Sequence, residues 1–239
     1  MRSLVMLVRG EFQRLIRYKL LQVGFAISVL WVLVMFLIGR DEAGAFVPFF
    51  VFMDASLMTV ILIGSGLFYE RQENTIKSLL ITPSSMGEII ISKLVSAIYI
   101  ALQSALFLSI VSIIFFSVGV NVGLLMLVVI LAALAHAMIG YTFAVLVKDF
   151  PTLLSLTMIY TLVFAFPSIM YALGVLGEPL NTVLLVSPTH ASMLLIDWAF
   201  GENVAPWLLV GGAAYLLILS VILGVFVVFP KYLEKAIGE

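Results

Sequence analysis

Six long apolar runs follow one another along this chain, separated by short polar segments. Each run is long enough to cross the hydrocarbon core of a bilayer with some tilt. Their expected bounds are residues 20–39, 46–68, 89–118, 122–147, 150–176 and 206–229. Runs of this length predict helices, because barrel strands alternate apolar and polar residues over only about ten positions. We therefore expect an all-α membrane protein with six transmembrane helices, in which residues 1–239 form a single transmembrane domain.

The segment before the first run, residues 1–19, has the pattern of an amphipathic helix. Apolar residues recur there at helical spacing: Leu4, Val8, Phe12, Leu15 and Ile16. Charged residues lie between them: Arg2, Arg9, Glu11, Arg14, Arg17 and Lys19. This pattern predicts a helix in the membrane interface, with its cations facing headgroups and its apolar stripe facing acyl chains.

The segment between the second and third runs, residues 70–88, is the most polar stretch between two spans. Ile76, Leu79 and Leu80 can form one face of a short helix there, and Pro83 would end it. The next helix is expected to begin near Ser85, which can form a capping box with Glu88.

The lysines and arginines fall almost entirely on one side of the expected topology. They precede the first span, lie in the second and fourth loops and follow the last span, whereas Arg40 alone falls on the other side. Cytoplasmic loops carry an excess of Lys and Arg. This distribution predicts that both termini and the 70–88 segment are cytoplasmic.

The last long loop, residues 177–205, contains no Lys or Arg and remains apolar for a solvated segment. Pro179, Pro188 and Gly201 interrupt its apolar stretches. Short re-entrant or interfacial helices that are buried against protein fit this composition, and we expect them outside the cytoplasm.

Composition supports the membrane assignment and excludes several kinds of site. Hydrophobic residues make up 64% of the chain and charged residues 10%, whereas a soluble domain has about 25% charged residues. The chain has no cysteine, so it has no disulfide and no thiolate metal ligand. It has no G-x-x-x-x-G-K-[ST] loop to hold nucleotide phosphates. We expect no catalytic residue, no metal site and no nucleic-acid partner.

Two motifs resemble a known family. The pattern E-R-x-x-x-T-x-x-x-L-L-x-x-P, carried by Glu70, Arg71, Thr75, Leu79, Leu80 and Pro83, resembles the cytoplasmic signature of ABC-2 type permeases, the membrane subunits of ATP-binding-cassette exporters. Lys93 matches the lysine that usually follows this pattern. The segment with Ser187, Pro188 and His190 resembles the S/N-P-x-x segment between the family's last two spans. Gln72 and Asn74 depart from the family's usual E-R-E-x-G-T.

The resemblance implies a function and a set of partners. It implies that two membrane subunits, identical or homologous, form a translocation path in the plasma membrane. It further implies that a coupling helix within 70–88 seats in a separate cytoplasmic ABC ATPase, present in two copies, which binds ATP and Mg²⁺. The expected coupling and ATPase-contact residues are Glu70, Arg71, Glu73, Thr75, Lys77, Leu79, Leu80 and Pro83. The expected cargo is a hydrophobic or amphipathic small molecule, such as a drug, an antibiotic or a peptide-like compound, moved out of the cell.

Several residues admit two interpretations. Glu70 and Arg71 form either a hinge ion pair that contacts the ATPase or solvated loop charges. Asp54, inside the second span, either touches cargo on the translocation path or pairs with a neighbour, since a lipid-facing carboxylate is costly. His136, inside the fourth span, is either a hydrogen-bonded packing residue, which is the expected role, or a proton carrier on that path.

Two other function classes are compatible with a membrane chain. An intramembrane enzyme would use Asp54, His136 and His190, which have no recognisable spacing and include no H-E-x-x-H pair. An ion-coupled secondary transporter would normally show internal repeats or interrupted helices near the midplane. Transport that collapses with the ion gradient but persists without ATP would identify the secondary transporter.

Overall fold

The computed structural model of the chain describes residues 2–73, 84–177 and 183–237, and within these ranges it contains helices and no strand. Six of its helical stretches are long and apolar enough to cross a membrane. They are Leu20–Ile38, Glu42–Gln72, Met86–Phe116, Val122–Leu146, Phe150–Ala172 and Pro206–Tyr232. The prediction of an all-α membrane protein with six spans is confirmed, and the expected bounds agree within a few residues except around the second span.

Several spans consist of more than one helical segment. The described elements are α1 (Arg2–Arg17), α2 (Leu20–Ile38), α3 (Arg40–Phe52), η1 (Met53–Met58), α4 (Thr59–Gln72), α6 (Met86–Phe116), α7 (Val122–Leu146), α8 (Phe150–Tyr160), η2 (Thr161–Ala165), α9 (Phe166–Ala172), α11 (Pro188–Ala199), α12 (Pro206–Ile222), η3 (Leu223–Val228) and α13 (Phe229–Ile237). The η segments are π-helical turns within the second, fifth and sixth spans. Such turns often occur at functional sites.

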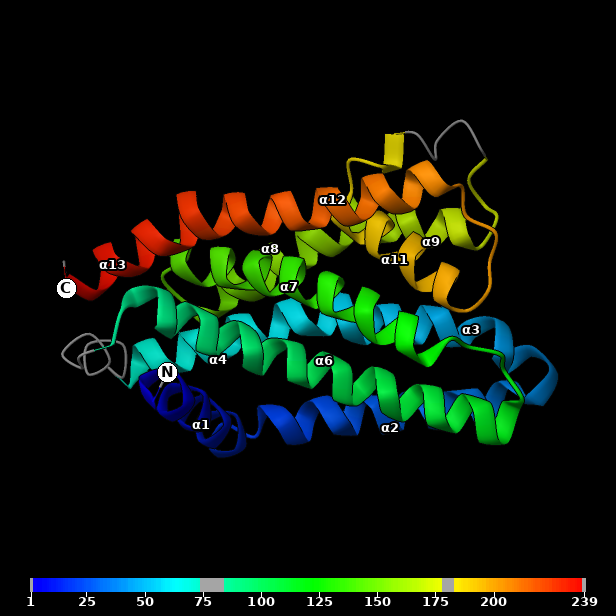
Figure 1. Ribbon diagram of the computed structural model, residues 1–239, viewed down its shortest axis with the longest axis horizontal. Coiled ribbons are helices and arrows are strands. Elements are labelled where there is room, and N and C mark those ends of the chain that lie inside the picture. The colour runs from blue at the N-terminus through cyan, green and yellow to red at the C-terminus, as the bar shows by residue number, and fades with distance from the viewer. Residues whose placement is uncertain (1, 74–83, 178–182, 238–239) are drawn as a thin grey trace.

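The spans run side by side along the long axis of the molecule and define two ends (Figure 1). Helix α1, the last turn of α4, the first turn of α6 and helix α13 lie at one end, together with both chain termini; we call this the terminal end. The α2–α3 and α6–α7 connections and helices α9 and α11 lie at the opposite or far end. The end of α4 and the start of α6 therefore lie at the same end as α1 and α13.

Helix α7 occupies the middle of the bundle, where it packs against α4, α6, α11 and α12. Its closest approach is to α4, and a Cβ atom on Gly140 would lie only 2.6 Å from the carbonyl oxygen of Val60. On the other side of the same contact, a Cβ on Gly64 would lie 3.2 Å from the Gly140 carbonyl oxygen. Small residues at these positions therefore let two membrane helices pack backbone against backbone.

The second span is longer than the sequence predicts. Helix α4 continues to Gln72, so Glu70 and Arg71 lie on a regular helix instead of in a polar loop. After the segment 74–83, α6 begins with the expected capping box, in which Ser85 and Glu88 each accept a backbone N–H from the other residue. Of the predicted coupling residues, Thr75, Lys77, Leu79, Leu80 and Pro83 lie outside the described residues.

Helix α1 packs against α6 and α2 with a face that differs from the predicted apolar stripe. Leu7, Glu11 and Leu15 are buried, whereas Ile16 is half exposed. Phe12 packs edge to face on Tyr99 of α6, with ring centroids 4.8 Å apart. The buried face of α1 thus contacts protein and includes a carboxylate, which corrects the expectation that this face is purely apolar and directed toward acyl chains.

Candidate functional site

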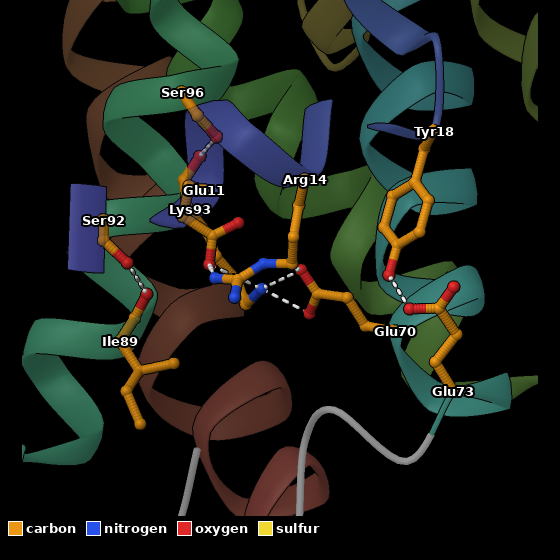
Figure 2. A network of polar contacts seen from close by, with 9 residues as sticks. All are labelled: Glu11, Arg14, Tyr18, Glu70, Glu73, Ile89, Ser92, Lys93 and Ser96. Carbon is orange, nitrogen blue, oxygen red and sulfur yellow. Dashed lines mark hydrogen bonds and ion pairs between the residues drawn. The ribbon is translucent and has the colours of Figure 1, made fainter. Parts of the chain in front are cut away.

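Four charged side chains from three separate helices meet inside the bundle near the terminal end (Figure 2). Glu11 and Arg14 come from α1, Glu70 comes from the last turn of α4, and Lys93 comes from the second turn of α6. We call these four residues the ionic cluster.

Lys93 is the hub of the ionic cluster. Its Nζ donates to Glu70 Oε1 at 2.6 Å and to the second oxygen of that carboxylate, and to Glu11 Oε1 at 3.0 Å. Arg14 donates to Glu11, and its Nε lies within ion-pair distance of Glu70 Oε1, at 3.2 Å. Glu70 and Lys93 are each 3% exposed and Glu11 is 4% exposed. Two carboxylates and two cations therefore compensate one another, and only Arg14 is partly exposed.

The electrostatics of the cluster favour the ionised form of Glu11. Burial by itself raises the pKa of this carboxyl, but the charges and hydrogen bonds of Lys93 and Arg14 outweigh burial and hold the pKa of Glu11 below its ordinary value. The same pairing with Glu11 raises the pKa of Arg14 despite its partial burial. Both groups of α1 thus remain charged in the folded protein at neutral pH.

A buried ion pair contributes little net stability, but removing one partner costs about 3–5 kcal/mol because the other charge is left unpaired. The ionic cluster therefore resists separation of α1, α4 and α6. A displacement of one of these helices at the terminal end moves the other two with it.

Arg71, the next residue on α4, attaches that helix to a different neighbour. Its Nη1 donates to the carbonyl oxygens of Ala144 at 2.7 Å and Val147 at 2.8 Å. These carbonyls lie at the carboxyl-terminal end of α7, where helix carbonyls lack intrahelical partners and a cation is favourable. Arg71 thus joins the ends of α4 and α7.

Glu73 extends these connections at the surface. Its carboxylate accepts from the Tyr18 hydroxyl at 2.8 Å and from Arg17 Nη2 at 3.2 Å, both at the junction of α1 and α2. On the other flank, Glu88 accepts from the Ser3 hydroxyl of α1 at 2.6 Å. The described residues on both sides of the segment 74–83 are therefore bound to α1.

The structure shows how Glu70 and Arg71 are bonded within the chain, and a contact of either residue with an ATPase stays a prediction. Neither is a solvated loop charge, and Glu70 forms its ion pairs with Lys93 and Arg14 instead of with Arg71. The buried Glu70 carboxylate presents no surface to a partner subunit in this conformation. Their contacts hold the end of α4, the last helix before the segment 74–83, against α6 and α7.

Asp54 lies in η1 and is bound by neighbouring helices. Its Oδ2 accepts from Ser28 of α2 at 2.8 Å and from Ser104 of α6, and its Oδ1 accepts from Trp31 Nε1 of α2 at 2.8 Å. Three donors from two other spans thus satisfy this buried carboxylate. A contact of Asp54 with cargo stays a prediction.

His136 is fully buried in the middle of α7. Its Nδ1 lies 2.8 Å from the Ala132 carbonyl oxygen, and its ring packs edge to face on Tyr160 at 6.1 Å between centroids. No hydrogen bond joins His136 to Asp54 among the described residues. The geometry is that of a packing histidine, and its role on a translocation path stays a prediction.

The Ser187–Pro188–Thr189–His190 segment begins a short helix, α11, at the far end. Ser187 caps this helix, and the hydroxyls of Ser187 and Thr189 donate to the Phe164 carbonyl oxygen of η2 at 3.2 Å and 2.7 Å. Burial lowers the pKa of His190 to about 4. The prediction of a short helix buried against protein is confirmed here, and the segment's motif residues dock it onto the fifth span.

Sequence reasoning named Lys93 only as a motif match and did not place Glu11 or Arg14 in the site. A signal existed for Glu11, because it lies four residues from both Leu7 and Leu15 on one face of α1. An acid in the middle of an apolar stripe indicates a buried partner. The identity of that partner depends on the packing of α1 against α6, which local spacing does not specify.

Comparison with known proteins decides the family. The family model of fluoroquinolones export permease proteins matches residues 2–236, nearly the whole chain. This chain belongs to the fluoroquinolones export permease protein family. The match includes α1 and every described span, so the ionic cluster lies wholly within the family's region.

Two curated members of this family are similar to the chain over most of its length. They are the fluoroquinolones export permease proteins of two strains of Mycobacterium tuberculosis, CDC 1551 / Oshkosh and ATCC 25618 / H37Rv. Each is 22% identical over 208 residues, which cover 87% of this chain and 85% of the relative. The family agrees with the resemblance to ABC-2 type export permeases, and the six spans make the chain a multi-pass membrane protein.

Proposed function

We propose that this chain is the membrane subunit of an ATP-driven exporter, and that a separate cytoplasmic ATPase moves it by contacting the segment 74–83. In this proposal ATP and Mg²⁺ bind to two copies of the ATPase, and this chain carries no catalytic residue. A second membrane subunit, identical or homologous, completes the translocation path.

The main support for the proposal is that the described residues on both sides of this segment are bonded to several helices. Glu70, Arg71 and Glu73 precede it and are joined to α1, α6 and the end of α7. Glu88 and Lys93 follow it and are joined to α1. A force applied to the segment therefore reaches α1, α4, α6 and α7 together, which is what mechanical coupling requires.

The orientation follows from the distribution of cations. The terminal end carries the described positions of Lys and Arg except Arg40, which begins α3 at the far end. An excess of Lys and Arg marks the cytoplasmic side. This distribution supports the proposed orientation, in which the termini and the segment 74–83 are cytoplasmic and the chain lies in the plasma membrane.

The cargo is inferred from the family. The relatives from Mycobacterium tuberculosis are fluoroquinolones export permeases by name. We infer that this chain moves amphipathic aromatic drugs of that class out of the cell.

A crosslinking experiment tests the ATPase contact. The chain contains no cysteine, so Ser78→Cys introduces a single thiol in the segment 74–83. Crosslinking in native membranes, followed by mass spectrometry, is expected to yield an adduct with a subunit that carries a phosphate-binding loop. The matched control is Val186→Cys, an exposed position near the start of α11.

The outcomes separate the alternatives. An ATPase adduct at Ser78→Cys and none at Val186→Cys supports the exporter and its orientation. An ATPase adduct at Val186→Cys alone reverses the orientation. Adducts at Ser78→Cys that never include an ATPase, together with transport that follows an ion gradient, would replace the proposal with a secondary transporter.

A further inference from the structure

A large cavity opens at the far end, bounded by α3, α9, α11 and the segment that follows α11. Its volume is about 720 Å³, within the range of about 300–1,000 Å³ typical of small-molecule sites. The wall combines aromatic and apolar side chains with two carboxylates. The residues used below are Phe46, Phe49, Tyr171, Met193, Asp197 and Glu202.

Asp197 is the unusual member of this wall. Other acids of the chain have clear partners: Glu11 and Glu70 have cations, Asp54 has three donors, and Asp149 caps α8 by accepting the Thr152 N–H at 2.8 Å. The Asp197 carboxylate makes no hydrogen bond or ion pair with any residue that the structure describes. Its main-chain carbonyl oxygen accepts from the N–H groups of Phe200 and Glu202.

An unpaired carboxylate in this position destabilises the fold. Burial, with a smaller contribution from the negative charge of Glu202, raises the pKa of Asp197 to about 7. The Asp197 side chain is only partly buried, and it lines the cavity without a charged or hydrogen-bonding partner from the described residues. A perturbed acid that faces a cavity is a recognised sign of a binding site.

The remaining wall indicates what kind of molecule would supply the missing partner. Phe46 and Phe49 of α3 and Tyr171 of α9 present aromatic surface, and Met193 of α11 adds an adaptable apolar contact. Aromatic rings attract both aromatic ligands and cations. Carboxylates and aromatic rings together complement a flat ring system that carries a positive charge.

We propose that the far-end cavity binds an aromatic compound bearing a protonated amine, and that Asp197 and Glu202 are the acceptors for that amine. The ring system lies against Phe46, Phe49 and Tyr171. This proposal rests on the proposed export function, because it assigns the cargo class a site on the side where cargo leaves.

The cavity wall is also packed against the interior of the bundle. Phe50 contacts Phe46 and Phe49 at 6.4 Å and 5.7 Å between ring centroids, and Trp31 stacks on Phe50 at 5.0 Å. Trp31 is also the donor to Asp54. The ring face offered to a ligand therefore belongs to a fixed aromatic stack instead of a loose surface patch.

A binding experiment with two matched probes tests the site. The protein is the full chain in polymer-bounded membrane discs, which retain any partner subunits. The probes are a piperazinyl fluoroquinolone and its N-acetyl-piperazinyl analogue, which keeps the rings and loses the cationic amine. Dissociation constants are measured at pH 8, where the Asp197 carboxylate is mostly ionised.

The expected result is specific for both the probe and the residue. Asp197→Asn weakens binding of the cationic probe about tenfold or more and leaves the acetylated probe nearly unchanged, because only the charge interaction is lost. Glu202→Gln has the same direction and a smaller effect, since this side chain is exposed. The matched control is Glu42→Gln, an exposed acid at the start of α3 outside the cavity wall, which leaves both constants unchanged.

Other outcomes overturn the proposal in distinguishable ways. If the parent and Asp197→Asn bind the cationic probe with equal affinity, Asp197 is not part of a binding site. If Asp197→Asn loses the same affinity for both probes, Asp197 has a structural role. A further outcome is that Ser78→Cys forms no adduct with an ATPase while Asp197→Asn still weakens binding of the cationic probe alone. That result contradicts the proposed export function and supports the binding site in the cavity. If Asp197→Asn exports the cationic probe with the KM of the parent in an ATP-driven reaction, the binding site in the cavity is contradicted and the export function is supported.

Discussion

Lys93 Nζ lies 2.6 Å from Glu70 Oε1, and both side chains are buried although they come from different spans. Lys93→Met leaves Glu11 and Glu70 without their main cation. We expect this change to lower the free energy of unfolding by about 3–5 kcal/mol. In a chain of this size that corresponds to roughly 2–4 °C of melting temperature per kcal/mol, measured by thermal unfolding in detergent.

Two further variants keep this prediction specific. Lys231→Met removes a cation from the exposed pair with Glu234, and it should cost no more than about 1 kcal/mol. The double variant Lys93→Met, Glu70→Leu removes one base and one acid and should be less destabilised than Lys93→Met alone. Equal losses in Lys93→Met and Lys231→Met would contradict a stabilising role for the ionic cluster.

The backbone contact between α7 and α4 predicts a strong effect from one methyl group. Gly140→Ala places a Cβ atom 2.6 Å from the Val60 carbonyl oxygen, so the two helices must separate. We expect a loss of about 1–3 kcal/mol, as for other overpacked cores, seen as a lower melting temperature. Gly211→Ala on α12 is the control, since a Cβ there meets no atom within 4 Å.

Asp197 predicts a pH dependence of stability. Its pKa rises from an ordinary 3.8 to about 7 in the folded protein, so between these values the folded state binds more protons than the unfolded state. The free energy of unfolding therefore falls as pH rises across this window. Asp197→Asn should raise the melting temperature at pH 8 by several degrees, roughly 2–4 °C per kcal/mol, and change it little at pH 4.

The comparison must be made between parent and variant at each pH, because His190 acts in the opposite direction. Burial lowers its pKa from 6.5 to about 4, so its contribution to stability rises with pH up to about 6.5. A melting temperature for Asp197→Asn that differs from the parent by the same amount at pH 4 and pH 8 would show that this carboxyl does not titrate in the window.

Two substitutions of Asp54 are expected to differ in their effect on stability. Asp54→Asn keeps an oxygen acceptor for Trp31 and a polar partner for Ser28 and Ser104, so it should melt within about 1 kcal/mol of the parent. Asp54→Leu leaves the Trp31 N–H without its acceptor, whereas the Ser28 hydroxyl keeps the Gly24 carbonyl oxygen at 3.1 Å. We expect a loss of about 1–3 kcal/mol, the cost of one unsatisfied buried group. Normal export by Asp54→Asn would assign the residue to packing; lost export with an unchanged melting temperature would place it on the translocation path.

The sequence predicts the spans well because their signal is local. Continuous apolar runs mark the helices, and the Ser85–Glu88 spacing marks the start of α6, as the structure confirms. The end of the second span was misplaced because Glu70 and Arg71 look like loop residues by polarity. Their partners Lys93 and the α7 carbonyls are distant in sequence, and it is this pairing that allows charged residues to continue a buried helix.

The candidate site was predictable only in part for the same reason. The family motif directs attention to Glu70 and Arg71, and the inward direction of both side chains follows from tertiary packing. The sequence predicts that Arg14 faces headgroups and gives Glu11 no partner, because amphipathic spacing does not distinguish a helix that lies on lipid from one that packs on α6. Asp197 attracted no prediction as a binding residue, since its missing partner can be recognised only in three dimensions.

The charges of the ionic cluster have an electrical consequence. A single elementary charge that crosses a membrane potential of 100 mV gains or loses about 2.3 kcal/mol. Glu11, Arg14, Glu70 and Lys93 sum to zero, so a rigid displacement of this unit along the membrane normal does no net work against the voltage. We expect the ionic cluster itself to add no voltage dependence to a movement of α1, α4 and α6, so that any such dependence comes from the other charged residues of these helices, such as Arg9, Arg17 and Arg71.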